Sequence, residues 1–69
     1  MTLNETRLAT AQWHVTETRR IVERQKAIIE RKKRLGLDTS LSEDLLKTFE
    51  RTLTAFEDDF VGLRDGTRR

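Results

Sequence analysis

One histidine and a run of three carboxylates are the side chains best suited to chemistry. His14 is the only histidine, and Glu17 follows it three residues later, on the same face of a helix. A carboxylate beside an imidazole can orient the ring or share a metal ion with it. Di-iron bundles use glutamate and histidine in the opposite order and add further inward-facing glutamates. We therefore interpret His14 as a residue at the edge of the core that pairs with Glu17.

The carboxylate run at residues 57–59 reads Glu-Asp-Asp. Paired carboxylates act as acid and base when a pocket separates their pKa values. A protein of two helices offers no evident pocket, so we expect this run at a solvated helix end near Arg7. The sequence has no cysteine, no glycine-rich phosphate loop and no metal-ligand spacing. We predict that the protein is not an enzyme, with no catalytic residue, no cofactor, no metal ion and no small-molecule substrate.

The distribution of helix-breaking residues predicts the elements that carry these side chains. There is no proline, and the first of the three glycines is Gly36. The sequence therefore favours a long helix over about 4–35, a turn at 36–38 and a second helix over about 39–63. A connection this short makes the helices antiparallel neighbours. The predicted fold class is all-α, an antiparallel two-helix hairpin of coiled-coil type.

Capping residues mark the expected start of each helix. Thr2 and Glu5 have the spacing of a capping box, in which each side chain binds the backbone N–H of the other. Ser40 and Glu43 have the same spacing at the second helix, and Asp38 is an equally good cap there.

The length of the chain limits its organisation. At 69 residues it forms at most one small domain with a marginal core, which we place at 1–64, followed by a flexible basic tail at 65–69. No stretch approaches the roughly 20 apolar residues of a membrane span. The N-terminus lacks the basic and then apolar layout of a secretory signal, so we expect a cytoplasmic protein that does not bind membranes.

The apolar residues of the two helices form stripes of different width. Those of 39–63 have the alternating three- and four-residue spacing of a coiled-coil seam, which Leu41 and Leu45 widen near the turn. The seam consists of Leu46, Phe49, Leu53, Phe56, Phe60 and Leu63. The helix at 4–35 carries two rows about 120° apart. The first row is Leu8, Val15, Val22 and Ile29, and the second row is His14, Ile21, Ile28 and Leu35. The midline between the rows holds Ala11, Thr18, Gln25 and Lys32.

A stripe as broad as the two rows together cannot be covered by one neighbouring helix. One row can face the second helix, and the other needs a further partner. The simplest partner is a second copy, in a homodimer that forms an antiparallel four-helix bundle with a two-fold axis. In that bundle Gln25 lies either near the core, paired with its symmetry mate or another polar group, or at the edge in contact with water.

Charge is separated between the two helices. Residues 1–35 carry nine basic and four acidic side chains, a net charge of +5, and residues 36–65 carry three basic and eight acidic ones, a net charge of −5. Opposite charges favour the antiparallel pairing. Each exposed pair contributes at most about 1 kcal/mol, so the charges select the topology more than they stabilise it.

These features predict a protein whose function is to bind another protein, through homodimerisation and a surface of the first helix. The predicted partner-binding residues are Trp13, Arg20, Ile21 and Ile28. An exposed tryptophan is a frequent interface anchor, although Trp13 can instead fold over the edge of the bundle and shield Leu8 or Phe60. Docking on a larger complex fits the sequence as well as homodimerisation does.

The basic face of the first helix supports an alternative function, that of a small RNA- or DNA-binding regulator. The candidate nucleic-acid contacts are Arg19, Arg20, Arg24, Arg31, Lys33 and Arg34. No aromatic residues are interleaved for base stacking. A solvated face with basic residues at the negative end of the helix dipole explains the same pattern.

Several short motifs give the chain a resemblance to a group of small bacterial helical-hairpin proteins to which no activity is assigned. The motifs are His14-Val15, Arg19-Arg20-Ile21, Gln25, Gly36-Leu37-Asp38-Thr39, Leu45-Leu46 and Phe49-Glu50. They span about 14–53. Such proteins often have a small residue after the His-Val pair, where this chain has Thr16-Glu17-Thr18. The resemblance implies a self-contained hairpin and implies nothing about a substrate.

Overall fold

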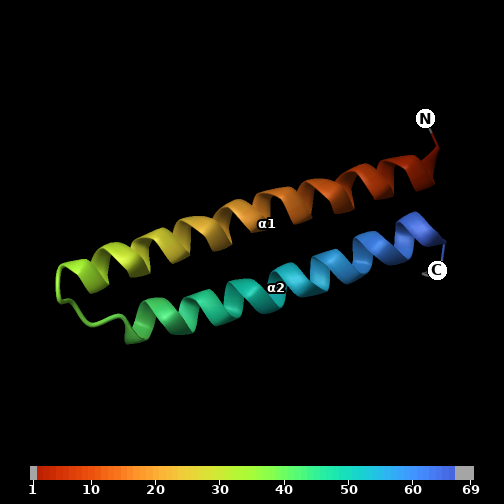
Figure 1. Cartoon of the computed structure of the whole chain (residues 1–69). Coiled ribbons are helices and arrows are strands. Elements are labelled where there is room, and N and C mark those ends of the chain that lie inside the picture. Colours follow the sequence, from red (N-terminus) through yellow and green to blue (C-terminus); the bar gives the residue numbers. More distant parts are fainter. Residues whose placement is uncertain (1, 67–69) are drawn as a thin grey trace.

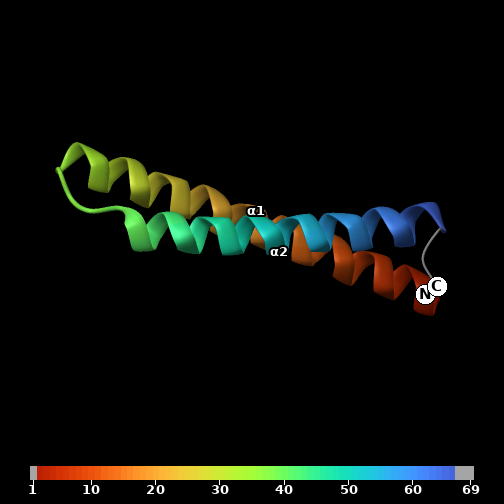
Figure 2. The ribbon, with the colours of Figure 1, turned by 90° about the horizontal axis from the view of Figure 1, so that it is seen from below.

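The computed structural model describes residues 2–66. Within that range the chain forms two helices, α1 (Leu3–Arg34) and α2 (Ser40–Asp65), and no strand. The helices run antiparallel, so that the start of α1 and the end of α2 lie together at one end and the turn at the other (Figure 1). The predicted all-α hairpin is confirmed. Its principal extents of 51 × 18 × 13 Å describe a rod, in which the helices cross each other (Figure 2).

The start of α1 is held by the predicted capping box. The Thr2 hydroxyl accepts a hydrogen bond from the Glu5 backbone N–H at 3.1 Å, and the Glu5 carboxylate accepts one from the Thr2 N–H at 3.3 Å. Two of the N–H groups that a helix leaves unpaired at its start are thereby satisfied.

The end of α1 is set by Gly36, as predicted. Its φ of +71° lies in the left-handed region, which glycine adopts without steric strain. The Gly36 N–H donates to the Lys33 carbonyl at 3.0 Å, and the Leu37 N–H donates to the Lys32 carbonyl at 2.9 Å. This pair of bonds is the Schellman motif, which satisfies the last carbonyls of the helix and turns the chain back.

The N-cap of α2 is Thr39, whose side chain makes no capping hydrogen bond, so neither of the two predicted residues takes that position. The Asp38 carboxylate accepts hydrogen bonds from the Ser40 backbone N–H at 2.9 Å and from the Ser40 hydroxyl at 2.7 Å. The prediction that Ser40 and Glu43 form a capping box is wrong, because the Ser40 hydroxyl is used as a donor to Asp38. The Glu43 carboxylate instead accepts from the Thr39 hydroxyl at 3.1 Å.

The end of α2 comes slightly later than predicted. Gly62 is buried and stays helical, and the helix continues to Asp65. Gly66, with a φ of +70°, then caps it. Asp65, which the sequence assigned to the tail, is therefore the last helical residue. Residues 67–69 of the predicted tail lie outside the described residues.

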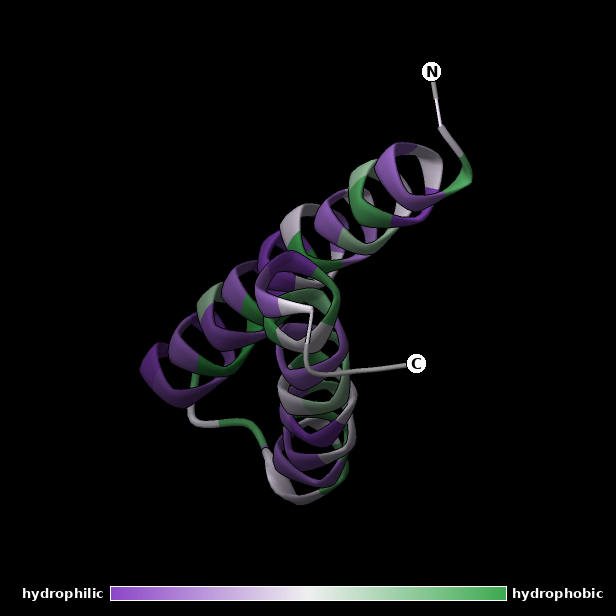
Figure 3. Cartoon of the chain, turned by 90° about the vertical axis from the view of Figure 1, so that its right-hand side faces the viewer, coloured by the Kyte–Doolittle hydropathy of each residue, from purple (hydrophilic) through white to green (hydrophobic). Residues whose placement is uncertain are grey.

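The two helices pack through a narrow seam. The side of α1 that α2 covers consists of the first apolar row and the midline, and its buried residues are Ala11, Val15, Thr18, Val22, Gln25 and Ile29. From α2, the predicted seam from Leu46 to Leu63 is half-buried against them. Hydrophobic stretches alternate with hydrophilic ones along both ribbons (Figure 3).

Gln25 takes the buried position of the two that the sequence left open. Its side-chain amide donates to the Ser42 backbone carbonyl at 2.8 Å, within the same chain. Two turns further along α1, the Lys32 ammonium donates to the Ser42 hydroxyl at 2.6 Å. This polar cluster fixes the position of α2 along α1 near the turn.

Candidate partner-binding surface

The two long edges of the hairpin differ in chemistry. Along one edge, ion pairs join the helices: Arg19 to Glu57 at 3.0 Å, and Lys33 to Glu43 at 4.0 Å. On α1, Arg19 and Lys33 directly follow the midline residues Thr18 and Lys32. On α2, Glu43 and Glu57 directly follow Ser42 and Phe56, which also face α1, so all four charged residues lie on the same side of the contact. We call this side the charged edge.

The opposite edge carries large apolar side chains that nothing covers. On α1, Ile21 and Ile28 each precede a buried seam residue, which places them on the side away from the charged edge. On α2, Leu45 directly precedes the seam residue Leu46 and therefore lies on the same side. We call this surface the apolar flank. It consists of Ile21, Ile28, Leu35, Leu41 and Leu45, whose exposed fractions range from 39% to 73%.

The α2 side of the apolar flank is free of charge over most of its length. Leu41, Leu45, Thr48, Thr52 and Ala55 follow one another at spacings of three and four residues, which keeps them on one helix face. The Thr48 and Thr52 hydroxyls donate to the carbonyls four residues earlier, at 3.3 and 3.1 Å. A partner can therefore cover this face without stranding a hydroxyl donor.

The accessible surface of the chain is large for its mass. It is 5487 Å², about 1000 Å² more than the roughly 4500 Å² expected for a compact monomer of 8.1 kDa. The radius of gyration of 15.6 Å exceeds the roughly 11 Å expected of a compact domain of this length. A rod of two helices therefore exposes surface that additional helices packed against it would cover.

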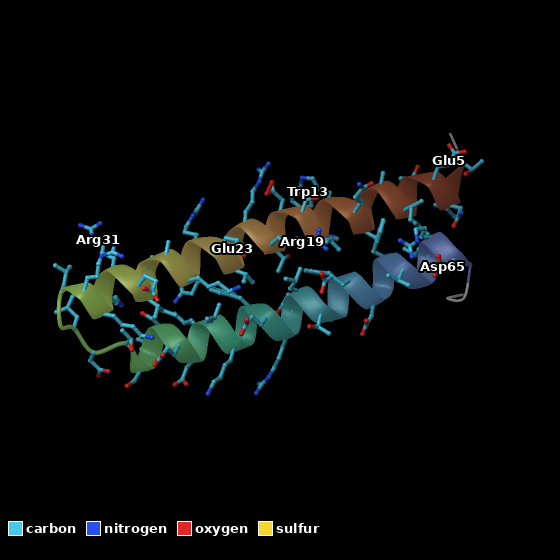
Figure 4. The ribbon with its side chains drawn as sticks, viewed as in Figure 1. Glu5, Trp13, Arg19, Glu23, Arg31 and Asp65 are labelled. Atoms are coloured by element: carbon cyan, nitrogen blue, oxygen red, sulfur yellow. The ribbon has the colours of Figure 1, made fainter. Side chains whose placement is uncertain are left out.

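Trp13 and Arg20 lie outside the apolar flank, although they were predicted to share one partner surface with Ile21 and Ile28. Trp13 is 59% exposed and projects from the side of α1 that faces away from α2 (Figure 4). It does not fold over the core. Its only ring contact among the described residues is edge-on to His14, at 5.3 Å.

The predicted pairing of His14 with Glu17 is wrong. The His14 ring stacks on Phe56 of α2, with 4.7 Å between centroids and 11° between planes. The Glu17 carboxylate is instead paired with Arg20 at 3.4 Å. His14 is half-buried at the edge of the seam, as expected, but the contact that holds it comes from the other helix.

The candidate nucleic-acid contacts do not form one face. Arg19 and Lys33 belong to the charged edge, where glutamates of α2 bind them. Arg31 projects away from α2, whereas Arg19 lies between the helices (Figure 4). Arg24, Arg31 and Arg34 are exposed and form no ion pair with any described residue.

Within residues 2–66, no three side chains of histidine, aspartate or glutamate lie close enough to hold a metal ion. Asp59 of the carboxylate run lines a shallow groove together with His14 and Arg7, and Glu57 binds Arg19. Two charged groups near the ends of α2 have shifted pKa values. Hydrogen bonds from Ser40 lower the pKa of Asp38, and the hydrogen bond to Asp65 raises the pKa of Arg64; both groups are exposed and lie near a helix end.

The sequence prediction missed Leu37, Leu41 and Leu45 as surface residues. The signal that could have found the last two is the stripe of uncharged residues along one face of α2.

No described helix is long and apolar enough to cross a membrane. Searches against family models, curated proteins and solved structures returned no match. The resemblance to small bacterial hairpin proteins thus stays a prediction.

Proposed function

We propose that this is a non-enzymatic protein that binds other protein chains, and that its first partner is a second copy of itself, bound through the apolar flank. The observation that carries the proposal is the exposure of Ile21, Ile28 and Leu45, which lie in one continuous surface beside an almost uncharged face of α2. Exposed apolar surfaces of this kind mark interaction sites.

The surface area agrees with a dimer. The excess of about 1000 Å² over a compact monomer compares with the roughly 800 Å² that each partner buries in a stable interface. Two hairpins joined at their apolar flanks form a four-helix bundle, in which each helix gains a second neighbour. Trp13 and Arg20 then lie on the outside of the bundle, available to a further partner.

Sedimentation equilibrium at micromolar concentrations tests the proposal. The unmodified chain should sediment at twice its mass of 8.1 kDa. Ile28→Lys should shift the equilibrium to monomers, because the dimer would bury the charge. Ala27→Lys is the matched control, since Ala27 is the exposed neighbour of Ile28 and points about 100° away.

The results separate the proposal from its competitors. A chain that is folded by circular dichroism but monomeric throughout the concentration range contradicts self-association. Equal effects of Ile28→Lys and Ala27→Lys contradict the assignment of the interface to the apolar flank.

A second candidate function, binding of nucleic acid, is favoured by the three arginines without carboxylate partners. Phosphate contacts make affinity fall steeply with salt. Replacing Arg24, Arg31 and Arg34 with alanine should flatten that dependence if these residues bind phosphates. No binding to mixed RNA or DNA at about 50 mM salt would eliminate this candidate.

A further inference from the structure

We infer that the two copies associate with their turns at the same end of the bundle, so that α1 of each copy faces α2 of the other. This inference rests on the proposed homodimerisation and adds the arrangement of the partners at the same surface. Two arrangements with a two-fold axis bring the apolar flanks together. An axis along the rod places the turns together and pairs α1 with α2 of the second copy. An axis across the rod places the turns at opposite ends and pairs each helix with its own copy.

The apolar residues are concentrated in the half of the flank near the turn. Ile21, Ile28 and Leu45 lie there, together with the still more exposed Leu35 and Leu41. Turns at the same end place this half against its counterpart, which buries the large side chains of both copies together.

The half of the flank near the chain ends is more polar. On α1 it carries Thr10, His14 and Glu17, with one exposed apolar residue, Leu3, at the start of the helix, and on α2 it carries Asp59. Turns at opposite ends would place Leu45 of one copy near Asp59 of the other, since the two residues lie at comparable distances from the middle of α2. Burying a carboxylate without a partner is unfavourable.

The charges of the helices select the same arrangement. The net charges of +5 for residues 1–35 and −5 for residues 36–65 attract when α1 faces α2 of the second copy. Turns at opposite ends would place the two basic helices side by side and the two acidic helices side by side, which is repulsive.

One pair of oppositely charged residues, at the rim of the contact between copies, favours the same arrangement. Arg31 and Asp44 are exposed and form no ion pair with any described residue. The Lys33–Glu43 ion pair shows that these parts of α1 and α2 lie at the same level of the rod. With the turns together, Arg31 of each copy therefore lies at the level of Asp44 of the second copy, across the outer rim of the contact between α1 and α2.

Energy transfer between labelled copies distinguishes the two arrangements. The chain has no cysteine, so Arg34→Cys and Ala9→Cys each create a unique attachment site on the exposed surface of α1. The sites are 25 residues apart, which is about 37 Å along the helix. We expect stronger transfer when donor and acceptor are both at position 34 than when the donor is at 34 and the acceptor is at position 9 of the second copy.

Turns at opposite ends would reverse this order. The two labels at position 34 would then be separated by about 45 Å along the rod, and the mixed pair by less than about 10 Å. Equal transfer in the two experiments would also overturn the inference, because it would mean that the copies adopt no single arrangement. Both of these outcomes are compatible with a dimer. A chain that sediments as a monomer would instead contradict both the proposed function and this inference.

A charge exchange provides a second test. Arg31→Asp and Asp44→Arg should each weaken dimerisation roughly two- to thirtyfold, because each removes two exposed ion pairs per dimer. The double variant should restore affinity, since every pair is re-formed with its charges reversed. Glu30→Arg is a control for net charge, because Glu30 is exposed on the other side of α1 from the apolar flank. Double variants no tighter than the single ones would overturn the arrangement.

Discussion

Replacement of Gln25 by alanine should destabilise the protein by about 1–2 kcal/mol. The substitution removes one buried methylene, which contributes about 0.8 kcal/mol, and one hydrogen bond, which contributes about 0.5–1.5 kcal/mol net. The higher helix propensity of alanine offsets a few tenths of a kcal/mol. Urea denaturation followed by circular dichroism at a fixed protein concentration measures the difference.

Replacement of Gln25 by methionine separates volume from hydrogen bonding. The acceptor of the Gln25 amide is the Ser42 carbonyl, which inside α2 also takes a helical hydrogen bond. Methionine fills a similar volume and leaves that carbonyl paired, so we expect a change within about 0.5 kcal/mol. A loss as large as that of the alanine variant would refute this reasoning, because it would show that the amide itself is required.

Three further substitutions test the packing, the turn and the start of α2. Ile29→Ala should lower the free energy of unfolding by about 2–4 kcal/mol, because Ile29 is only 5% exposed and its removal leaves a cavity; urea denaturation provides the value. Gly36→Ala should lower it by about 1 kcal/mol, through backbone strain at a φ of +71° alone, since no atom lies within 4 Å of an added Cβ; a thermal melt detects this. The lowered pKa of Asp38 means that its contribution to stability is complete above the pKa of the unfolded chain and is lost as the pH falls through the lower folded value. In an NMR titration, Asp38 should therefore become protonated below the pH of an exposed aspartate, and Asp38→Asn should abolish that part of the acid sensitivity.

The hairpin itself could be predicted because its signals are local. The absence of proline, the glycine at position 36 and the Thr2–Glu5 box each act within a few residues of the backbone they control. The cap of α2 was harder to predict. Asp38, Thr39 and Ser40 are all residue types that favour an N-cap. The helix begins one residue after Thr39, and Asp38 binds the Ser40 N–H from outside the helix.

Contacts between the helices could not be derived in the same way. An apolar period of 100° per residue shows that α1 has two rows, but it does not show which row α2 covers. The choice depends on the charged edge, where Arg19 meets Glu57 across 38 residues of sequence. The partner of His14 was missed for the same reason, since Phe56 is remote in sequence and Glu17 is close.

The distribution of side chains between the seam and the apolar flank explains why folding and association should be coupled. The seam of α1 buries Thr18 and Gln25, while the larger apolar Ile21 and Ile28 remain on the flank. On α1, a hairpin that was stable alone would bury isoleucine in preference to threonine and glutamine. In the proposed dimer Ile21 and Ile28 would stabilise the fold, because a second copy would cover them.

The midpoint of thermal unfolding should therefore rise with protein concentration. A tenfold increase favours a folded dimer over unfolded chains by about 1.4 kcal/mol. For two chains of 69 residues, this raises the midpoint by about 3–6 °C. The Ile28→Lys variant should melt at a lower temperature that does not depend on concentration, while Ala27→Lys should behave like the unmodified chain. A midpoint of the unmodified chain that stays constant over a hundredfold range of concentration would show that each hairpin folds without its partner.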